Sequence, residues 1–418
     1  MSTRGMITVA MAFAMVAAVL AGCSAPERGD AGGTQTVVST GAGPAGTDAG
    51  APEALAYPEG YECVFNADCG WQQEAATKEM NSALSTQPEI HVVFGHNDPS
   101  AYGAYLAAQQ EGEGREEQIK FIGIDGLAHE GINYVRQGSL DVTFYYPSGG
   151  PEAIKAAVRI LGGEKVAQNI ALGTKLITAE NVDSGGEEMP PDEMPGWETA
   201  DVLDEGDLPQ LSGDQYLIGM SQCNLAEPWR KQMDADIAAA AADHPELKVL
   251  FKDAQGKAET QQAHVREFID QGVDLIIISP LEAQPLTEPV EEAMKEGIPV
   301  IVLDRKIASD NYTCYIGGAN VKMGREAGKW VRRQFPEGCK IVELTGLMTS
   351  TPAQERHEGF LLGLNTPDSE LGTEAPAVEP AEPEAPAEPT EDDAAVEPDA
   401  NAAATLTEEA PAEEAATE

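Results

Sequence analysis

Two blocks of this chain alternate short, largely apolar runs with segments of helical periodicity. In the block 215–364 the runs are YLIGMS, KVLF, DLIIIS and PVIVLD, and in the block 58–181 they are YECVFN, IHVVFG, IKFIGID and LDVTFYY. Strands that are apolar throughout need helices on both faces of their sheet, which is the usual arrangement of parallel sheets. Because helical segments separate these runs, the sequence predicts an α/β fold built from doubly wound parallel sheets.

The N-terminus predicts export and lipidation. Arg4 precedes an apolar run from Met6 to Leu20 that is too short to span a bilayer comfortably, and the sequence LAGC follows at 20–23. This ending resembles the lipoprotein box of bacterial signal peptides, whose cysteine becomes the acylated first residue. We therefore expect a signal peptide at 1–22 and a lipid anchor at Cys23, which would place the protein in the cell envelope, outside the cytoplasm. The alternative is an ordinary signal peptide in which Cys23 has no role.

Composition separates the two blocks from three other segments. Residues 23–57 are rich in Gly, Ala, Thr and Pro and are expected to form a flexible tether. The acidic segment 182–214 is expected to be a linker, and 365–418, which has 17 acidic residues and no Lys or Arg, a disordered tail. The net charge of −45 argues against nucleic acid as a partner, because phosphate binding needs clustered basic residues.

The sequence lacks the familiar motifs of enzymes and metal sites. It has no Gly-x-Ser-x-Gly and no P-loop, and its six histidines show no metal-ligand spacing. No Cys-x-x-Cys occurs, so the five cysteines beyond Cys23 are expected to be buried free thiols. The expectation is a binding protein without cofactor or metal.

Polar residues follow the apolar runs in both blocks. They are Ser221, Gln222, Ser279, Asp304, Arg305, Asn97 and Asp125. Ligands of parallel α/β sheets bind at the carboxyl ends of the strands, so these residues predict a cleft for a polar ligand. The simpler alternative at each position is the capping of the following helix.

Several of these segments resemble the type I periplasmic sugar-binding proteins, a family that includes the ribose- and galactofuranose-binding proteins. IGMSQCNLAEPWRKQM, DLIIISPLEAQPL and IPVIVLDR resemble the first lobe of that family, and KIVELTGLMTSTPAQERHEGF resembles the opening of the second. HVVFGHNDPSAYGAYLAAQ and FIGIDGLAHEGINYVRQGSLDVTF resemble the remainder. The resemblance implies a two-lobed fold, each lobe a doubly wound parallel sheet, with crossings between lobes near Gly317, Pro147 and Ala171.

The order of the segments differs from that of the family. There, the helix ending at Leu364 would be followed shortly by the strand at Tyr61, which here comes first. We therefore expect a circular permutation, in which 58–181 is the C-terminal half of the family fold, 215–364 is the N-terminal half, and 182–214 joins them. The run YECVFN should then pair beside KIVELTG. Orphan fragments or a swapped dimer are the alternatives, and fragments are disfavoured because they would expose long unpaired strand edges.

The resemblance also implies which residues hold a sugar. Trp229 would stack on the sugar ring, and Asp304 and Arg305 would bind its hydroxyls. Arg356, Asn97 and Asp125 match ligand positions of the other lobe, whereas Asp98 is expected to cap a helix. Further candidates are Ser221, Gln222, Ser279, Glu282, Trp71 and Tyr146. Tyr146 stands where the family usually has a polar residue such as glutamine.

The function that these expectations indicate is that of a monomeric, lipid-anchored solute-binding protein. It would close two lobes around a monosaccharide and present it to the permease of an ABC importer. The alternative is a sugar-sensing subunit for a membrane receptor or kinase, with the same site. A glycosidase using Asp125 and Asp304 is conceivable, but it would leave the tryptophan and the arginines unexplained.

Overall fold

A computed structural model describes residues 55–213 and 215–371, all of them within one compact unit, Ala54–Glu418. The expected signal peptide, Cys23 and the tail beyond residue 371 lie outside the described residues. None of the helices in the described ranges has the length and apolar character that crossing a membrane requires. The cysteines described are all free, and four of the five are buried.

One sheet is built mainly from the second block, and all its neighbouring strands are parallel. In spatial order its strands are β10 (Leu247–Asp253), β9 (Tyr216–Gln222), β11 (Leu275–Ser279), β12 (Val300–Leu303), β13 (Cys314–Gly318), β5 (Asn169–Leu172) and β8 (Glu198–Thr199). Strands β11 and β12 are buried at every residue. The runs DLIIIS and PVIVLD are therefore the covered centre of this sheet, as predicted, whereas KVLF forms the partly exposed edge strand β10.

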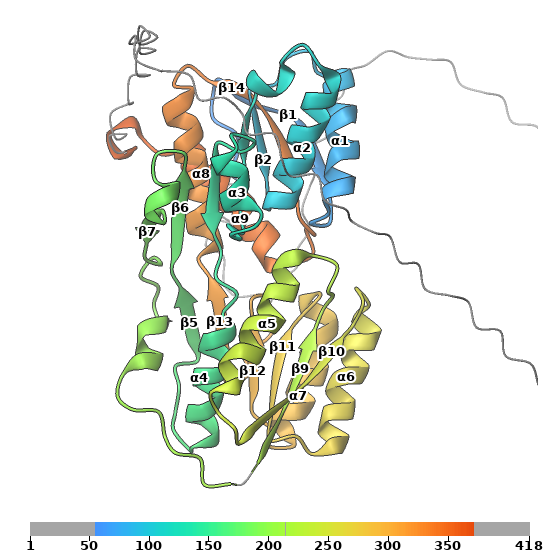
Figure 1. Cartoon of the computed structure of the whole chain (residues 1–418), viewed down its shortest axis with the longest axis vertical. Coiled ribbons are helices and arrows are strands. Elements are labelled where there is room, and N and C mark those ends of the chain that lie inside the picture. Colours follow the sequence, from blue (N-terminus) through green and yellow to red (C-terminus); the bar gives the residue numbers. More distant parts are fainter. Residues whose placement is uncertain (1–54, 214, 372–418) are drawn as a thin grey trace, which may run out of the picture. The chain divides into compact units, whose positions relative to one another are not determined.

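Four helices accompany the first sheet (Figure 1). They are α4 (Gly150–Leu161), α5 (Pro228–Ala242), α6 (Ala258–Gln271) and α7 (Ala283–Lys295). In α5, proline occupies the first helical position, where no backbone N–H is needed. Trp229, Met233 and Ile237 follow at intervals of four residues and are buried, so this stripe fixes the face that α5 turns inward.

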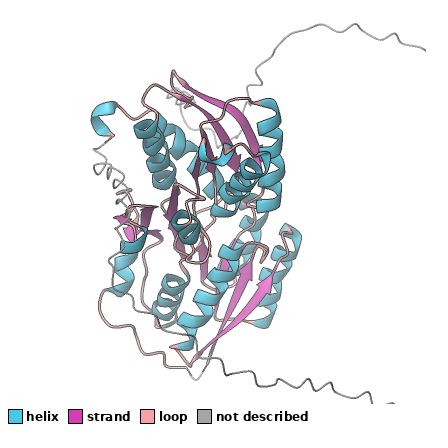
Figure 2. Cartoon of the chain, turned by 45° about the horizontal axis from the view of Figure 1, so that its top comes forward, coloured by secondary structure: helices cyan, strands magenta, loops and turns pink. Residues whose placement is uncertain are grey.

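The other sheet combines both blocks. In spatial order its strands are β1 (Tyr61–Asp68), β14 (Cys339–Thr345), β2 (Val92–Gly95), β3 (Lys120–Ile122), β4 (Val142–Tyr145), β6 (Thr174–Thr178) and β7 (Glu187–Met189). Its helices are α1 (Gln73–Thr86), α2 (Asp98–Glu111), α3 (Gly131–Arg136), α8 (Asn320–Gln334) and α9 (Thr351–Leu364). Strand β6 runs antiparallel to both of its neighbours, β4 and β7. The expectation of a parallel sheet is therefore wrong at this edge. In Figure 2 helices flank the strands.

The predicted pairing of YECVFN with KIVELTG is confirmed. Strand β1 runs parallel to β14, with Tyr61 opposite Cys339 and a bulge between Cys63 and Phe65. The two ends of the described chain also meet nearby, because the side-chain amide of Asn365 donates to the carbonyl of Ala56 at 2.9 Å. Segments about 300 residues apart in sequence are thus neighbours in space.

Helix α9, which carries Arg356, lies against α8 at close backbone contact. A Cβ added to Gly324 would lie 2.2 Å from the carbonyl oxygen of Arg356, so only glycine fits at this crossing. Phe360 on the same helix is fully buried and stacks on Phe94 of β2 at a centroid distance of 4.4 Å. The helix that ends the second block therefore rests on a sheet in which β1, β2, β3, β4 and β6 come from the first block.

The chain passes between the sheets after β13, after β4 and between β5 and β6. These are the places near Gly317, Pro147 and Ala171 that the family resemblance implied. The acidic segment adds a fourth passage, since β7 belongs to one sheet and β8 to the other.

The described residues also include short 3-10 turns. They are η1 (Arg115–Glu117), η2 (Val182–Ser184), η3 (Ala200–Asp204) and η4 (Asp368–Glu370), which follows α9.

The acidic segment 182–214, which was expected to be a linker, also packs against both sheets. It supplies an edge strand to each sheet, and Met189 and Leu203 are buried in the core. Asp192 forms an ion pair with Arg325 of α8 at 2.9 Å. This packing leaves no sign in the sequence, because edge strands pair through their backbone and need no apolar run.

This packing predicts a stability difference within the acidic segment. Leu203→Ala should lower the free energy of unfolding by about 2–4 kcal/mol, because Leu203 is 2% exposed and its removal leaves a cavity. Met194→Ala is the matched control, since Met194 is 40% exposed and should change stability by less than about 0.5 kcal/mol. Urea denaturation of both variants tests this, and equal effects would mean that the segment is not packed.

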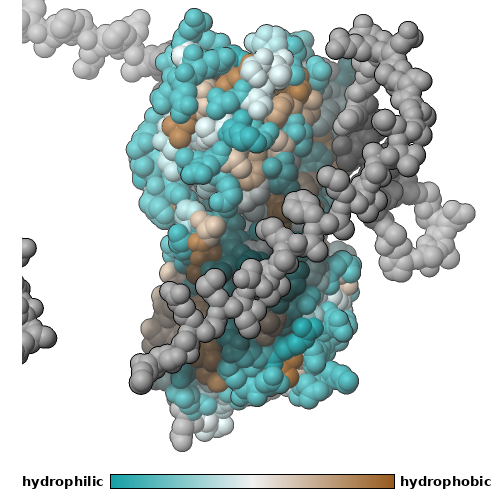
Figure 3. All heavy atoms as spheres, turned by 90° about the vertical axis from the view of Figure 1, so that its right-hand side faces the viewer, coloured by the Kyte–Doolittle hydropathy of each residue, from teal (hydrophilic) through white to brown (hydrophobic). Residues whose placement is uncertain are grey.

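Exposed apolar surface is sparse in the described part of the chain. The large apolar residues that are exposed there are Leu55, Met194 and Phe251. The face drawn in Figure 3 is mainly hydrophilic, with apolar residues scattered between polar ones. The chemistry that recognises a ligand must therefore be sought among buried polar groups.

Candidate functional site

The carboxyl ends of the strands of both sheets converge on one small cavity. It is lined by Trp71, Asn97, Asp125, Tyr146, Glu227, Trp229, Arg230, Asp304, Pro352 and Arg356. Seven of these ten residues were predicted from the sequence. The cavity measures about 20 Å³ in this conformation, room for about one water molecule.

Asp304 is the most densely contacted acid of the site. It follows β12 with a φ of 67°, and its Oδ1 accepts a hydrogen bond from the Tyr146 hydroxyl at 2.6 Å. Its Oδ2 forms an ion pair with Arg230 Nη2 at 2.7 Å. Burial acts to raise the pKa of Asp304, but the charges of Arg230 and Arg305 outweigh it and hold the pKa below its usual value. Asp304 is therefore a buried, ionised acceptor.

Arg230 is a site residue that the sequence reasoning missed. It is 3% exposed and donates to the hydroxyl of Ser279 at 2.8 Å. Ser279 was predicted to bind ligand directly, but here it orients this arginine. The missed signal was the position of Arg230 next to Trp229 in the first turn of α5, which faces the strand ends.

Two aromatic rings lie face to face in the cavity. Tyr146 and Trp229 stack with centroids 5.0 Å apart and an interplanar angle of 19°. Trp229 Nε1 donates to the Tyr146 carbonyl at 2.8 Å. The tryptophan predicted to stack on a sugar is thus covered by a tyrosine of the same chain.

Arg356 enters from the opposite sheet. Its Nε donates to Asn320 Oδ1 at 2.9 Å and its Nη1 to the carbonyl of His96 at 2.5 Å. The guanidinium lies 5.2 Å from the centroid of the Trp71 ring and 4.8 Å from that of Tyr146. Because two acceptors and two aromatic faces fix it, Arg356 is held rigidly at the cavity wall.

Asn97 lines the cavity and also takes the capping role that was expected of Asp98. Asn97 caps α2, since its Oδ1 accepts from Ser100 N at 3.0 Å, and its amide also donates to the Trp71 carbonyl at 3.1 Å. The expectation that Asp98 caps the helix is wrong. Its carboxyl group accepts from Gly126 N at 2.7 Å and from the Thr143 hydroxyl at 2.6 Å. Asp98 is the first helical residue, so its side chain reaches back to the neighbouring strand ends.

These contacts predict which of the two residues matters more for stability. Asp98→Ala should lower the free energy of unfolding by about 2–4 kcal/mol, because two buried donors lose their acceptor. Asn97→Ala should cost about 1 kcal/mol through the lost cap. Chemical denaturation of both variants measures the difference, and the reverse order would contradict these assignments.

Asp125 completes the acidic side of the cavity. Its φ of 134° is unusual for a residue other than glycine, and the residue is 5% exposed. Burial and the neighbouring Asp98 raise the pKa of Asp125 well above its usual value. Burial likewise raises the pKa of Asp98 to about 7. A protonated Asp125 could both donate and accept hydrogen bonds, which suits a ligand with hydroxyl groups.

Five predicted residues lie outside this cavity, Ser279 among them. Ser221 faces His264 Nδ1 at 3.2 Å, and Gln222 donates to Asp234 at 3.0 Å, so both serve contacts within their own lobe. Arg305 and Glu282 line a larger outer cleft of about 700 Å³. That cleft shares Trp71 and Glu227 with the inner cavity and so lies directly outside it.

Several buried donors at the site have no acceptor among the described residues. They are Trp71 Nε1, Arg230 Nε and Arg305 Nε. Unpaired buried donors are costly, and a ligand that supplies oxygen acceptors would relieve this cost.

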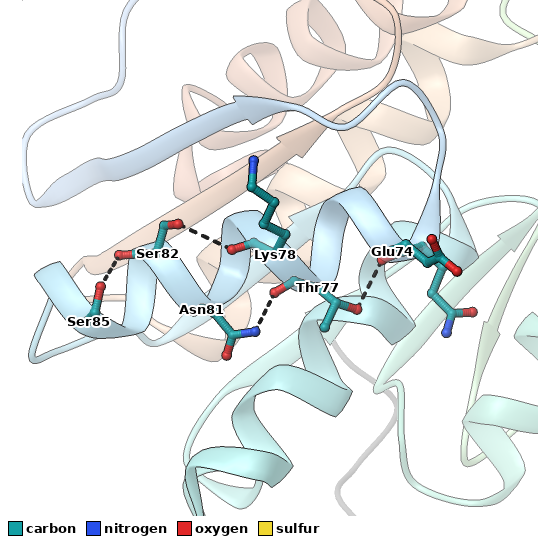
Figure 4. A pocket seen from close by; sticks show the side chains of 7 residues that line it. Glu74, Thr77, Lys78, Asn81, Ser82 and Ser85 are labelled. Atoms are coloured by element: carbon teal, nitrogen blue, oxygen red, sulfur yellow. Dashed lines mark hydrogen bonds between the residues drawn. The ribbon is translucent and has the colours of Figure 1, made fainter.

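A hollow along helix α1 is a poorer candidate (Figure 4). It is lined by polar residues of one helix, from Gln73 to Ser85. Their polar groups bond back to the helix, as when Thr77 donates to the Gln73 carbonyl at 3.0 Å and Asn81 to that of Thr77 at 2.9 Å. This surface offers few free groups to a ligand.

Comparison with known proteins identifies related chains. A model of the family described as periplasmic binding protein domain matches residues 44–165 and 218–410. The chain is 30% identical over 154 residues to the ribose import binding protein of Bacillus subtilis (strain 168), covering 36% of this chain and 50% of that protein. It is 31% identical over 147 residues to the galactofuranose-binding protein of Escherichia coli (strain K12), covering 34% and 46%. The chain thus spans about half the length of the curated relatives it matches.

Solved structures give a similar picture at about the same coverage. The fructose binding periplasmic domain of a hybrid two component system is 44% identical, with 36% of this chain and 50% of that chain covered and a TM-score of 0.35. A galactofuranose binding protein is 30% identical, with 36% and 51% covered and a TM-score of 0.34. At such TM-scores the structural likeness supports no conclusion, and the family assignment depends on the sequence matches.

Proposed function

Because this chain belongs to the periplasmic binding protein domain family, we propose that it binds a monosaccharide between its two sheets and delivers it to an ABC importer. The observation that favours this function most is the cavity shared by both sheets. It combines an ionised acid, Asp304, with the guanidinium groups of Arg230 and Arg356 and the aromatic face of Trp229. Fixed planar donors and acceptors beside an aromatic plane suit the hydroxyl rim and the apolar face of a sugar.

Closure around the ligand follows from the same geometry. Asp304 and Trp229 belong to one sheet's side of the cavity and Arg356 to the other's, so the two sides must approach to share one ligand. The outer cleft of about 700 Å³ is the proposed route of entry for the ligand.

Extracytoplasmic location and lipid anchoring at Cys23 belong to the same proposal, and the LAGC sequence at 20–23 motivates them.

A thermal-shift screen tests the binding function. The chain without residues 1–22 is heated with single pentoses and hexoses, and amino acids at the same concentration are the control. A ligand at about 100 times its Kd stabilises the folded state by about 2.7 kcal/mol, so one or a few sugars should raise the melting temperature by several degrees. A panel in which every sugar behaves like the amino acids would contradict the proposal.

We also propose that the chain is a circular permutant of the family fold. Both blocks match the same family model, and the contact between Asn365 and Ala56 places the ends of the folded part together. Matches to single relatives extend over 154 and 147 residues, close to the length of one block, as expected when only one block can align in order.

Rejoining the chain tests this proposal. A variant that starts at residue 215, joins Asn365 to Ala56 through a short glycine linker and ends at residue 213 should fold and keep the sugar affinity within about threefold. The junction bridges atoms that are already in contact, so it should introduce little strain. Calorimetry and circular dichroism measure affinity and folding. A rejoined chain that is unfolded would refute the permutation without affecting the sugar-binding proposal.

A further inference from the structure

Tyr146 lies in the cavity among the groups that the proposed function assigns to a sugar. Its ring covers Trp229 at 5.0 Å, and its hydroxyl donates to Asp304 at 2.6 Å. Arg356 lies 4.8 Å from its ring centroid. These three partners are the stacking plane, the acceptor and the cation assigned above to the ligand. Tyr146 itself is only 3% exposed.

The neighbouring backbone is shaped to receive this ring. A Cβ added to Gly318, the last residue of β13, would lie 1.9 Å from Tyr146 Cε2. The side-chain amide of Asn320 lies 3.4 Å from the Tyr146 hydroxyl. The ring therefore has a defined seat between the two sheets, and the remaining space, about 20 Å³, is too small for a monosaccharide.

Tyr146 also stands where the chain leaves one sheet for the other. It directly follows β4, and Pro147 and Gly149, with a φ of 71°, separate it from α4. Its carbonyl accepts from Trp229 Nε1, which holds its backbone to the opposite side of the cavity. A rotation of the side chain would empty the site while that backbone contact persists.

We propose that Tyr146 is a built-in competitor that the sugar must displace, so that this residue determines the affinity of the site. The inference rests on the proposed sugar-binding function. Tyrosine and sugar cannot use Asp304 and Trp229 at once, so the apparent Kd is the intrinsic Kd divided by the fraction of molecules in which the ring has left. Removing contacts that hold the Tyr146 ring in the cavity should therefore tighten ligand binding.

The test compares Tyr146→Phe with the wild type by calorimetry, using the sugar that gives the largest thermal shift. The phenylalanine keeps the stacking on Trp229 but loses the hydrogen bond to a charged acceptor, so the sugar should bind about tenfold more tightly or better. Tyr146→Ala, which also loses the stacking, should bind more tightly still if it remains folded. Tyr145→Phe is the matched control and should leave the affinity unchanged, because Tyr145 does not line the cavity.

Each outcome decides between the proposals. Unchanged or weaker binding by Tyr146→Phe would overturn the competitor role, because it would mean that the hydroxyl assists the ligand or is indifferent to it. The sugar-binding function would then stand. Failure of both wild type and Tyr146→Phe to bind any sugar would instead overturn the proposed function, and the competitor role with it.

Discussion

Replacing Asp304 with asparagine is expected to weaken sugar binding by about tenfold, because the sugar loses a charged acceptor but the competing Tyr146 hydroxyl loses the same one. Asparagine keeps the shape of the side chain but removes the negative charge, and a hydrogen bond to a charged acceptor contributes about 1.5–3 kcal/mol. The substitution also leaves Arg230, 2.7 Å away, without its counter-charge in a buried place. Arg230 would then no longer be held in position for the ligand. Isothermal calorimetry on the folded variant measures the loss.

The same variant should be less stable, and this must be separated from the change in affinity. Breaking a buried ion pair costs about 3–5 kcal/mol, so the affinity is compared at a temperature where both proteins are folded. Asp234→Asn is the matched control. Asp234 also accepts a side-chain hydrogen bond, from Gln222 at 3.0 Å, but it does not line the cavity and should leave affinity unchanged. Equal losses in both variants would mean that the site has been misplaced.

The central strands and most of the cavity could be predicted because they depend on local patterns. The runs DLIIIS and PVIVLD are buried throughout as β11 and β12, and the polar residue after PVIVL, Asp304, reaches the cavity. The β1–β14 pairing could be predicted only from the resemblance to a family, since the two strands lie about 280 residues apart.

Features that depend on tertiary contacts could not be predicted in this way. Strands β7 and β8 lie in a polar, glycine-containing segment and are defined by the strands they join. The roles of Asn97 and Asp98 depend on which of two adjacent residues begins the helix, a boundary that periodicity alone leaves uncertain. In the sequence Arg230 looks like an ordinary helix residue, because its partner Asp304 is 74 positions away and only the fold brings the two together.

Glu343 is the second residue whose loss should have a large effect, and no sequence pattern pointed to it. It interrupts the apolar strand β14 and is fully buried. His357 Nδ1 lies 2.8 Å and His96 Nε2 3.0 Å from its Oε1. Its Oε2 accepts from the Tyr57 hydroxyl at 2.9 Å and from Asn66 at 3.1 Å. One carboxylate therefore connects β1, β2, β14, α9 and the segment that leads into β1.

Replacing Glu343 with glutamine is expected to lower the free energy of unfolding by about 3 kcal/mol, because it removes the charge on which these donors converge. The control is Glu358→Gln on helix α9, an exposed position where the change should stay within about 0.5 kcal/mol. Urea denaturation at pH 6 measures both variants. Similar stabilities for the two would mean that the buried carboxylate is not a structural anchor.

The effect of Glu343→Gln should also depend on pH, with a maximum between about pH 4.5 and 6.5. Burial acts to raise the pKa of Glu343, but His357 and His96 lower it far below its usual value of 4.5, so its contribution is present above that value and lost as the pH falls. The hydrogen bond to Glu343 raises the pKa of His357 above its usual value of 6.5. The stabilisation from the charge of His357 is therefore complete below that value and is lost as the pH rises through the raised pKa.

The burial that lowers the pKa of His96 is common to wild type and variant and should largely cancel in the stability difference. Denaturation of wild type and variant from pH 4 to pH 8 should therefore give a stability difference that is largest near pH 5–6 and declines on both sides. A difference that does not vary with pH would show that glutamine disturbs packing and that the charge of Glu343 is not the source of the stability.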